Sequence, residues 1–380
     1  MPLKNPIRVA VVVPKYGLVG GAEAFVYELT ERLALKQGLE IHVICNRWRP
    51  GASQVRFHKA PKIPFPRWLR PLSFAYSVQR IINPHKFDIV HSHERIFECD
   101  LMTFHGIPHK NWVKEARAKR LTLFDRATAY AEKRCIGNRR LKRIFPVSSL
   151  VKEEFQRIYE TDESKIEIMH PGISLKRFSL SNHEGARHEM RKALGLSPDD
   201  IAVLFVGMNF EIKRLGLILK GIARAKAIES RAGALRLLIA GKGDNGRYMK
   251  MAGSLGIEKR VTFLGVVNDV ERYFFASDIF AMPSIFDTFG IVVLEAMAAG
   301  LPVIISETVG AKDIVSQGNS GFVLPKNPSE NDMANALLSL LDQDKRIDMG
   351  KRGNKAALNH DWDAVASRMA EIYRKTAAQG

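Results

Sequence analysis

The chain has 380 residues, more than one hydrophobic core usually supports, so two domains of ordinary size are expected. Hydrophobic residues make up 46% and charged residues 26%, which excludes a disordered or fibrous protein. The formal net charge is +18. Residues 1–150 hold 27 Lys and Arg against 11 Asp and Glu, whereas residues 151–380 hold 31 against 29. The first part should therefore meet an anionic partner, whether nucleic acid, an acidic membrane surface or a phosphorylated substrate.

Cysteine usage and hydropathy indicate a cytoplasmic protein. Cys45, Cys99 and Cys135 are far apart and form no CxxC pair, which is typical of a reducing compartment. No apolar run reaches the ~18 residues of a membrane-spanning helix. The apolar stretch at residues 7–13 is interrupted by Arg8, and it is too short and β-branched for a signal peptide.

Short β-branched runs alternate with amphipathic stretches along the whole chain, a pattern typical of parallel sheets flanked by helices. In chain order, strands are expected at residues 8–13, 40–45, 88–91, 144–147, 202–206, 236–240, 261–263, 279–282 and 302–305. Helices are expected at 22–36, 151–159, 217–227, 248–255 and 291–299. The sequence therefore predicts an α/β protein of two Rossmann-like, doubly wound domains.

Two segments of the first domain depart from this rhythm. Residues 59–72 mix Pro, aromatics and cations, so we expect an exposed loop followed by a helix at 73–82. Residues 110–143 are rich in Lys and Arg, with Trp112 and Phe124 among them. Such a helical segment is either a solvated face or a surface that docks on an anionic membrane, and we favour the membrane.

The first domain boundary is expected at residues 170/171. Pro171 and Gly172 interrupt the pattern there, and a polar stretch at 179–191 follows before the second series of strands.

A glycine-rich loop follows the first strand and leads into a helix. Gly17, Gly20 and Gly21 allow a ligand to approach the backbone, and the free N–H groups of a helix start favour a phosphate. The spacing is not GxGxxG, and Asn46 rather than an acid follows the second strand. Ordinary NAD binding is therefore disfavoured.

Two carboxylates stand out between residues 284 and 297. Asp287 lies in a loop after an expected strand, and Glu295 lies inside an apolar helical run. A buried glutamate is costly without a partner, and a carboxylate can accept two hydroxyl hydrogen bonds from a ribose or sugar. Taken singly, each residue is explained as well by a helix cap or a satisfied core glutamate.

Together with its flanks, this stretch resembles a known family. Asp287-x7-Glu295 resembles the E-x7-E motif of retaining GT-B glycosyltransferases (group 1, family 4). Further matches follow in the family's order, at Gly20-Gly21-Ala22-Glu23, Asp88-Ile89-Val90-His91, Phe104-His105-Gly106, His170-Pro171-Gly172-Ile173, Val206-Gly207, Lys213, Ile239-Ala240-Gly241, Val261-Thr262-Phe263-Leu264-Gly265, Asp278 and Ala298-Ala299-Gly300-Leu301-Pro302-Val303. The resemblance covers essentially the whole chain, and it is greatest to the glucosyltransferases that extend the lipopolysaccharide inner core.

The resemblance implies two Rossmann-like domains that face each other across a cleft. Residues 1–170, joined by a C-terminal helix at about 358–380, would bind the acceptor, and residues 171–357 would bind the nucleotide sugar. His105, Asp287 and Lys213 would be catalytic. Donor-binding residues would be Gly20, Gly21, Gly207, Lys213, Arg214, Gly241, Asp287, Phe289, Gly290, Ile291 and Glu295.

Individual roles also come from the resemblance. Glu295 would hold the ribose, and Asp287 would hold sugar hydroxyls beside the amides of Phe289 and Gly290. Lys213 would neutralise charge on the diphosphate and on the leaving group. His105 would lie near the reacting sugar.

The chain departs from the family at three positions of the diphosphate site. Met208 and Ile212 stand where the family often has arginine, and Arg214 stands where it usually has glycine. Either Arg214 replaces the missing guanidinium, or the diphosphate site has one cation fewer.

The resemblance implies UDP-glucose as donor, no metal, and a phosphorylated glycolipid acceptor at the inner face of the cytoplasmic membrane. His91, His93, His105 and His109 are too loosely spaced to favour a metal site. A GDP-mannose or exopolysaccharide enzyme, and a degenerate nucleotide-binding protein, remain alternatives. A nucleic-acid-binding protein is disfavoured because no recognised motif supports it.

Overall fold

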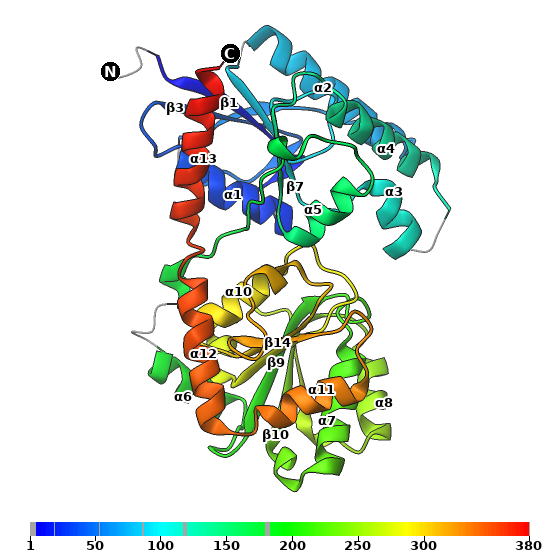
Figure 1. Ribbon diagram of the computed structural model, residues 1–380, viewed down its shortest axis with the longest axis vertical. Coiled ribbons are helices and arrows are strands. Elements are labelled where there is room, and N and C mark those ends of the chain that lie inside the picture. The colour runs from blue at the N-terminus through cyan, green and yellow to red at the C-terminus, as the bar shows by residue number, and fades with distance from the viewer. Residues whose placement is uncertain are drawn as a thin grey trace. The chain divides into compact units, whose positions relative to one another are not determined.

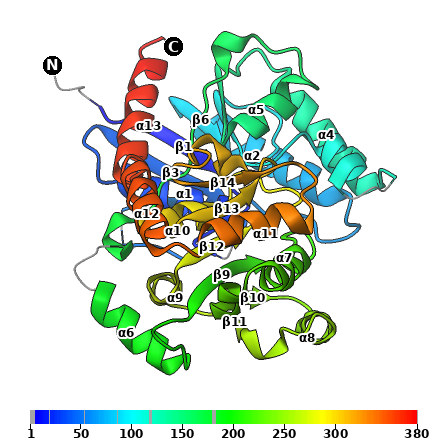
Figure 2. The ribbon, with the colours of Figure 1, turned by 60° about the horizontal axis from the view of Figure 1, so that its bottom comes forward.

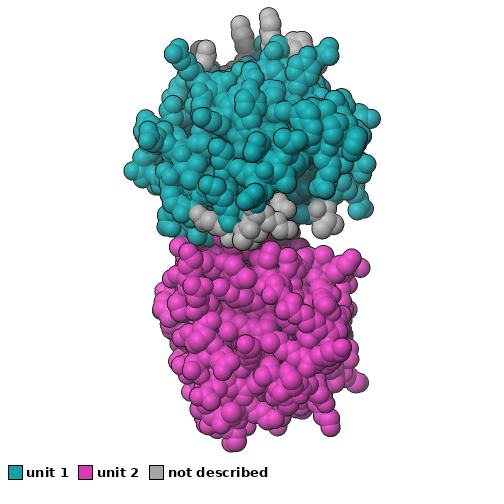
Figure 3. Space-filling model, turned by 90° about the vertical axis from the view of Figure 1, so that its right-hand side faces the viewer, with its two compact units in different colours: residues 1–172, 362–380 teal, residues 173–361 magenta. Residues whose placement is uncertain are grey.

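The computed structural model describes residues 5–18, 20–52, 54–85, 87–116, 120–178 and 183–379. The chain forms two compact units, coloured separately in Figure 3. Unit 1 comprises residues 1–172 and 362–380, and unit 2 comprises residues 173–361. The C-terminal segment therefore belongs to the same unit as the N-terminal half of the chain.

Unit 1 is built on a six-stranded sheet in the order β5-β3-β1-β6-β7-β8, in which every pairing is parallel. Its central strands β1, β3 and β6 are almost entirely buried and rich in Val and Ile, as expected of a sheet covered on both faces. The strands are β1 (Ile7–Val12), β3 (Leu39–Cys45), β5 (Arg56–Lys59), β6 (Ile89–Ser92), β7 (Leu101–Phe104) and β8 (Arg143–Pro146), with a small pair β2 (Lys15–Tyr16) and β4 (Arg47–Trp48).

The helices of unit 1 include the last helix of the chain. They are α1 (Gly21–Leu33), α2 (Leu69–His85), α3 (His109–Asn111), a π-helix (Trp112–Ala116), α4 (Leu123–Ile136), α5 (Ser149–Gln156) and α13 (Trp362–Ala377). α13 packs against α1, next to which it lies in Figure 1, and also on β1 and β6. The Trp362 and Phe25 rings meet edge to face at 5.1 Å, which fixes α13 on α1.

Unit 2 repeats this topology with the order β11-β10-β9-β12-β13-β14, again with every pairing parallel. In both sheets the strand order reverses beside the first strand, between β1 and β6 in unit 1 and between β9 and β12 in unit 2. The strands are β9 (Ile201–Met208), β10 (Leu235–Lys242), β11 (Val261–Gly265), β12 (Ile279–Met282), β13 (Val303–Ser306) and β14 (Gly321–Leu324). Ligands bind preferentially at the carboxyl ends of strands beside such a reversal.

Helices cover both faces of the unit 2 sheet. They are α6 (His183–Ala193), α7 (Leu215–Ile228), α8 (Asn245–Ser254), α9 (Val270–Ala276), α10 (Ile291–Ala298), α11 (Glu330–Ser339) and α12 (Gln343–Ala357). α7 and α11 lie side by side, as Figures 1 and 2 show, and α10 packs against α12. Buried side chains from α7, α11 and strands β9 and β10 form one hydrophobic core.

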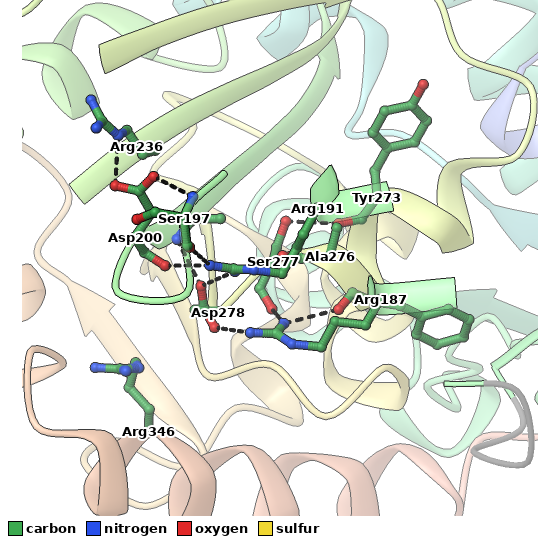
Figure 4. A network of polar contacts seen from close by, with 12 residues as sticks. Arg187, Arg191, Ser197, Asp200, Arg236, Tyr273, Ala276, Ser277, Asp278 and Arg346 are labelled. Atoms are coloured by element: carbon green, nitrogen blue, oxygen red, sulfur yellow. Dashed lines mark hydrogen bonds and ion pairs between the residues drawn. The ribbon is translucent and has the colours of Figure 1, made fainter. Parts of the chain in front are cut away.

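A buried polar network ties α6 to the start of β12 (Figure 4). The Asp278 carboxylate accepts hydrogen bonds from Arg187 at 2.6 Å, from Arg191 at 3.1 Å and from the Ala202 amide at 2.7 Å. Arg191 also donates to the carbonyl of Asp200 at 2.7 Å. Because the Asp278 carboxylate is nearly enclosed, these bonds offset its loss of hydration and hold the first residue before β12 in place.

The two connections between the units run side by side. Unit 1 ends at Gly172, where the boundary was expected at residues 170/171, and it resumes at Trp362, where about 358 was expected. The Ile173 amide donates to the His360 carbonyl at 2.8 Å, which joins the two connecting segments. A Cβ at Gly172 would lie 2.7 Å from the Trp362 backbone nitrogen, so this close approach requires glycine.

Other expected segments also differ. Of the polar stretch at 179–191, residues 183–191 lie in α6, and 179–182 lie outside the described residues. Within the expected loop at 59–72, Lys59 ends β5 and α2 begins at Leu69. The 110–143 segment is only partly helical and ends in β8. Strands β2, β4, β5, β7 and β14 were not predicted. β2 and β4 have only two residues each, and β5 is mostly polar.

Candidate functional site

The predicted site residues of unit 2 gather at the carboxyl ends of β9 and β12, which are neighbours in the sheet. One loop, residues 209–214, leaves β9, and another, residues 283–290, leaves β12. The Ile285 amide donates to the Ile212 carbonyl at 2.7 Å, so the backbone itself joins the two loops. This edge lies at the point where the strand order reverses, the position at which such sheets bind ligands.

Lys213 and Asp287 form an ion pair between these two loops. Their side chains are 17% and 18% exposed, so the pair is partly shielded from water but still open to a ligand. The Asp287 backbone is anchored, because its N–H donates to the Thr308 carbonyl at 3.0 Å and its carbonyl accepts from the Gly310 amide at 2.9 Å. The sequence predicted both residues for one site, and the structure brings them together.

The second loop ends at the start of α10. Gly290 precedes the helix with φ of 85°, and a Cβ there would lie 2.9 Å from the Met282 side chain. The Phe289 ring is buried, and its amide donates to Asp287 Oδ1 at 3.3 Å. Ile291 is the first helical residue. The first amides of a helix have no intrahelical acceptor, and they favour an anion.

Glu295 lies one turn further along α10. Its side chain is 16% exposed, and its nearest cation is Arg177, with 3.9 Å between Nη1 and Oε1. Arg177 makes a closer ion pair with Glu271, at 2.8 Å. Burial raises the pKa of Glu295 to about 7, with Arg177 opposing and Glu271 reinforcing the increase. A mostly buried carboxylate with so distant a cation is suited to bind hydroxyl groups.

Two glycines allow the neighbouring strands β9 and β10 to approach closely. Gly207 and Gly241 are register partners. A Cβ on Gly241, whose φ is 131°, would lie 1.9 Å from the Gly207 carbonyl oxygen. A Cβ on Gly207 would lie 3.2 Å from Cγ of Lys213. Gly207 therefore gives room to the stem of Lys213, and Gly241 is required by the backbone.

Arg214 adopts a left-handed conformation with φ of 53° immediately before α7. Its Nη2 donates to the Lys326 carbonyl at 3.0 Å, and its Nη1 is buried without a hydrogen-bond partner. Met208 is 56% exposed at the end of β9. Lys213 is therefore the cation that this loop places against Asp287.

Gly20, Gly21 and His105, the other predicted site residues, belong to unit 1. Gly20 precedes α1 with φ of 152°, and a Cβ there would lie 2.0 Å from Glu23 Oε2. The carboxylate of Glu23 thus lies over the glycine loop at which we expected a phosphate. Around Gly21 a Cβ would meet nothing within 4 Å.

His105 follows β7 and belongs to a stack of histidine rings. His105 Nε2 and His93 Nδ1 share a hydrogen bond of 2.9 Å, and the Phe25 ring meets His105 edge to face at 4.9 Å. Burial and the neighbouring Arg95 lower the pKa of His105 to about 3, so the imidazole is neutral near pH 7. Among the described residues, no group of three or more His, Cys, Asp or Glu side chains has the arrangement of a metal site.

Sequence comparison places both units in known families. Residues 186–356 match the model of the glycosyl transferases group 1, and residues 19–177 match that of glycosyltransferase family 4. The chain belongs to these glycosyltransferases. Between them the two models account for most of unit 2 and most of the N-terminal part of unit 1.

Two curated relatives illustrate the sequence similarity. The glycosyltransferase is 27% identical over 341 residues to an uncharacterised glycosyltransferase of Methanocaldococcus jannaschii, covering 85% of this chain and 86% of that protein. It is 32% identical over 276 residues to the D-inositol 3-phosphate glycosyltransferase of Rhodococcus opacus, covering 68% of this chain and 60% of that protein. The chain thus spans about three fifths of the length of the Rhodococcus relative.

Among solved structures, the glycosyltransferase resembles WaaG, a glycosyltransferase involved in lipopolysaccharide biosynthesis. The TM-score is 0.81 at 22% identity, covering 96% of this chain and 99% of WaaG. At this identity the likeness establishes the fold alone. It confirms the predicted fold class, two parallel-sheet α/β domains of the GT-B type.

Sequence reasoning missed Arg177 as a neighbour of Glu295. The two residues are far apart in the chain, and no periodicity connects them.

In the described part of the glycosyltransferase, no helix is both long and apolar enough to cross a membrane.

Proposed function

We propose that this glycosyltransferase transfers a hexose from a nucleotide sugar, with UDP-glucose as the donor, to an anionic glycolipid such as the lipopolysaccharide inner core. The observation that carries this proposal is the grouping of Lys213, Asp287 and the start of α10 at the ends of β9 and β12. A cation, a carboxylate and free helix amides are the groups that a nucleoside diphosphate sugar requires.

Each side chain has a role in this proposal. Glu295 accepts hydrogen bonds from the ribose hydroxyls, and Asp287 accepts them from the sugar. The ion pair orients the Lys213 ammonium toward the diphosphate, where it neutralises the charge that develops as the leaving group departs. The Gly290 amide supplies a further donor, and the Phe289 amide donates to Asp287 Oδ1 and so orients that carboxylate. The step needs no metal ion in this scheme.

The reaction proceeds with retention of configuration. The bond between the sugar C1 and the diphosphate oxygen breaks while the acceptor oxygen bonds to C1 on the same face, and the acceptor proton moves to the leaving phosphate. His105 is neutral at pH 7, because its pKa is lowered to about 3. It therefore acts as a hydrogen-bonding group near the sugar rather than as an acid or a cation.

We also propose that unit 1 docks on an anionic membrane. In the 110–143 segment Trp112 and Phe124 are half-buried, whereas Leu123 and Tyr130 are exposed. The segment before α2 exposes Phe65 to 82% and Trp68 to 39%. Aromatic side chains beside Lys62 and Arg67 suit the interface of an anionic membrane.

Calorimetric titration with UDP, GDP and ADP tests the donor site. We expect one diphosphate, UDP, to bind, and Glu295→Ala to weaken it at least tenfold, whereas Glu184→Ala, an exposed acid on α6, should bind normally. Selective binding of GDP would favour a mannosyl donor. Binding of UDP without hydrolysis or transfer of UDP-glucose would indicate a nucleotide-binding protein, and binding of none of the three would contradict the proposal.

A further inference from the structure

Unit 1 contains a cavity at the carboxyl ends of β1 and β6, the two strands between which its sheet order reverses. Its volume is about 410 Å³, which is enough for a small phosphorylated molecule. Segments following both strands, the loop before α2, and helices α2 and α4 line it. The lining residues are Pro14, Lys15, Glu23, Lys62, Arg67, Arg70, Pro71, Phe74, Glu94, Arg95, His109, Phe124 and Thr128.

The lining is strongly cationic, with three lysine and arginine side chains from one short segment, Lys62, Arg67 and Arg70, and two from the strand ends, Lys15 and Arg95. Only two acids, Glu23 and Glu94, face them. Among the described residues, no carboxylate lies within ion-pairing distance of Lys15, Lys62, Arg67 or Arg70. Four of the five cations are therefore not neutralised by direct contact.

Arg95 is the exception, because it is ion-paired with two glutamates. Its Nε donates to the buried Glu132 carboxylate at 2.7 Å, and Glu94 lies 3.6 Å from its Nη1. Glu94 is thereby engaged with Arg95. Glu23 is then the one acid of the lining that can balance the other four cations, and a bound anion would balance the rest.

The pKa of Lys62 reflects the positive charges that surround it. Burial, together with the neighbouring Lys15, Arg70 and Arg47, lowers its pKa, and Glu94 only partly opposes this effect. Grouping like charges in a half-buried position is unfavourable for the folded chain. An anion bound in the cavity reverses that effect, because it interacts favourably with every one of these cations.

The segment that carries these cations is held in place. Arg70 Nε donates to the Pro64 carbonyl at 2.7 Å, and the Ile63 amide donates to Ser73 Oγ at 3.0 Å. Lys62 and Arg67 are thus presented by a segment pinned to α2 rather than by a free loop. Such preorganisation reduces the entropy cost of binding an anion.

The rest of the lining is apolar. Phe74 is buried and Phe124 half-buried, and Pro14 and Pro71 lie at the same cavity. Flat apolar surfaces of this kind pack against the carbon faces of a sugar ring or a short chain. A bare inorganic anion would leave them without contact, so the cavity fits a phosphate attached to an organic body.

We propose that this cavity binds a phosphate monoester on a sugar-like or short organic body, with Lys15, Lys62, Arg67 and Arg70 holding the phosphate and Phe74 and Phe124 contacting the body. The inference rests on the proposed function in one respect: the phosphate is carried by the acceptor to which the hexose is transferred. The phosphate belongs either to a soluble sugar phosphate or to a lipid headgroup, and both share this chemistry.

The test compares two probes on the full-length chain. Glucose 6-phosphate, with glucose as its uncharged control, is titrated calorimetrically. Vesicles of phosphatidylcholine with and without phosphatidic acid, whose headgroup is a phosphate monoester, are used in sedimentation. The variant Lys62→Met/Arg67→Gln removes two cavity cations from the segment before α2. Arg80→Gln removes an exposed cation from α2 itself, outside the cavity lining.

We expect the double variant to lose at least tenfold in affinity for whichever probe binds, and Arg80→Gln to bind as the parent does. Binding of glucose 6-phosphate but not glucose identifies a soluble source, and binding to phosphatidic acid vesicles alone identifies a lipid source. The double variant should melt no lower than the parent, since it relieves repulsion between cations. Equal loss in both variants, or no binding of either probe, overturns the proposal.

The same samples are titrated with UDP, which separates the two conclusions. Intact UDP binding with no binding of either phosphate probe means that this inference fails while the donor site stands. Phosphate binding lost in Lys62→Met/Arg67→Gln, with no nucleotide binding by the parent, means that the phosphate site stands while the proposed transfer reaction fails.

Discussion

Lys213 and Asp287 lie 74 residues apart in the chain and form a partly buried ion pair across the two loops at the edge of the unit 2 sheet. The pairing means that neither charge is isolated. It also means that changing either residue affects both the charge of the site and the orientation of its partner.

Lys213→Ala should therefore act mainly on turnover. Removing one charged donor from the developing negative charge typically costs a factor of about 100–1000 in kcat. We expect a loss of that order in sugar transfer, with the KM for the donor changing much less. Lys220→Ala, an exposed lysine on α7, is the control and should retain parental kcat. A rise in KM with kcat unchanged would mean that Lys213 binds the ground state only.

Glu295 predicts a pH dependence of nucleotide binding. Its pKa is raised to about 7, so the carboxylate that accepts ribose hydroxyls is largely protonated at pH 6 and ionised at pH 8. Affinity for the nucleotide should rise between these values, and binding at pH 6 should release a proton. Titration in buffers of different ionisation enthalpy measures that release. Glu295→Gln should bind weakly with no such dependence, and a pH-independent parent would contradict the assignment.

The same carboxyl group predicts an opposite effect on stability. Its pKa is about 7 in the folded chain, against an ordinary value of 4.5. The folded state therefore retains a proton that the unfolded state releases, and stability falls as pH rises from 4.5 through 7, by about 3 kcal/mol at most. Glu295→Gln should unfold at higher urea concentration than the parent at pH 8, and the difference should vanish toward pH 4.5.

Gly241 is required by the backbone of the unit 2 sheet. Gly241→Ala places a Cβ 1.9 Å from the Gly207 carbonyl oxygen and at φ of 131°, so we expect a loss of roughly 3 kcal/mol in the free energy of unfolding. Gly256→Ala also has a positive φ, of 65°, but meets nothing within 4 Å. It should lose only about 1 kcal/mol. Urea unfolding of both variants checks the difference, and equal losses would rule out the steric cause.

Tyr373 on α13 anchors the last helix to the unit 1 sheet. Its hydroxyl shares a hydrogen bond of 2.7 Å with His91 Nδ1, and both side chains are fully buried. Tyr373→Phe leaves the His91 nitrogen without its partner, so unit 1 should lose about 1–3 kcal/mol of stability. Tyr76→Phe, which alters an exposed tyrosine on α2, should change thermal unfolding little. Similar melting temperatures for the two variants would show that the hydrogen bond contributes nothing net.

Much of the fold could be predicted from the sequence because its central strands are rich in Val, Ile and Leu. Residues 279–282 were predicted with the bounds that β12 has. By contrast, β5 is Arg-Phe-His-Lys at an edge of the sheet, and such a polar edge strand carries no hydrophobic signal. β7, Leu-Met-Thr-Phe, was also missed, and its length does not explain this, because β12 has four residues as well.

Some residues of the candidate site could also be predicted from the sequence, and others could not. Asp287 and Glu295 are recognisable by their spacing, because the loop and the helix that carry them are contiguous. The Arg177–Glu295 and Arg177–Glu271 contacts depend on tertiary structure, as do the cavity in unit 1 and the carboxylate of Glu23 over Gly20. Local patterns cannot predict which distant charges a fold will bring together.

The return of α13 to unit 1 has a consequence for how the chain is made. During synthesis, all of residues 173–361 leave the ribosome before Trp362 does, so unit 2 can reach its final structure while unit 1 still lacks a helix. Until then, the places on α1, β1 and β6 where α13 packs stay open to solvent. In the nascent chain, the half that begins first is therefore completed last.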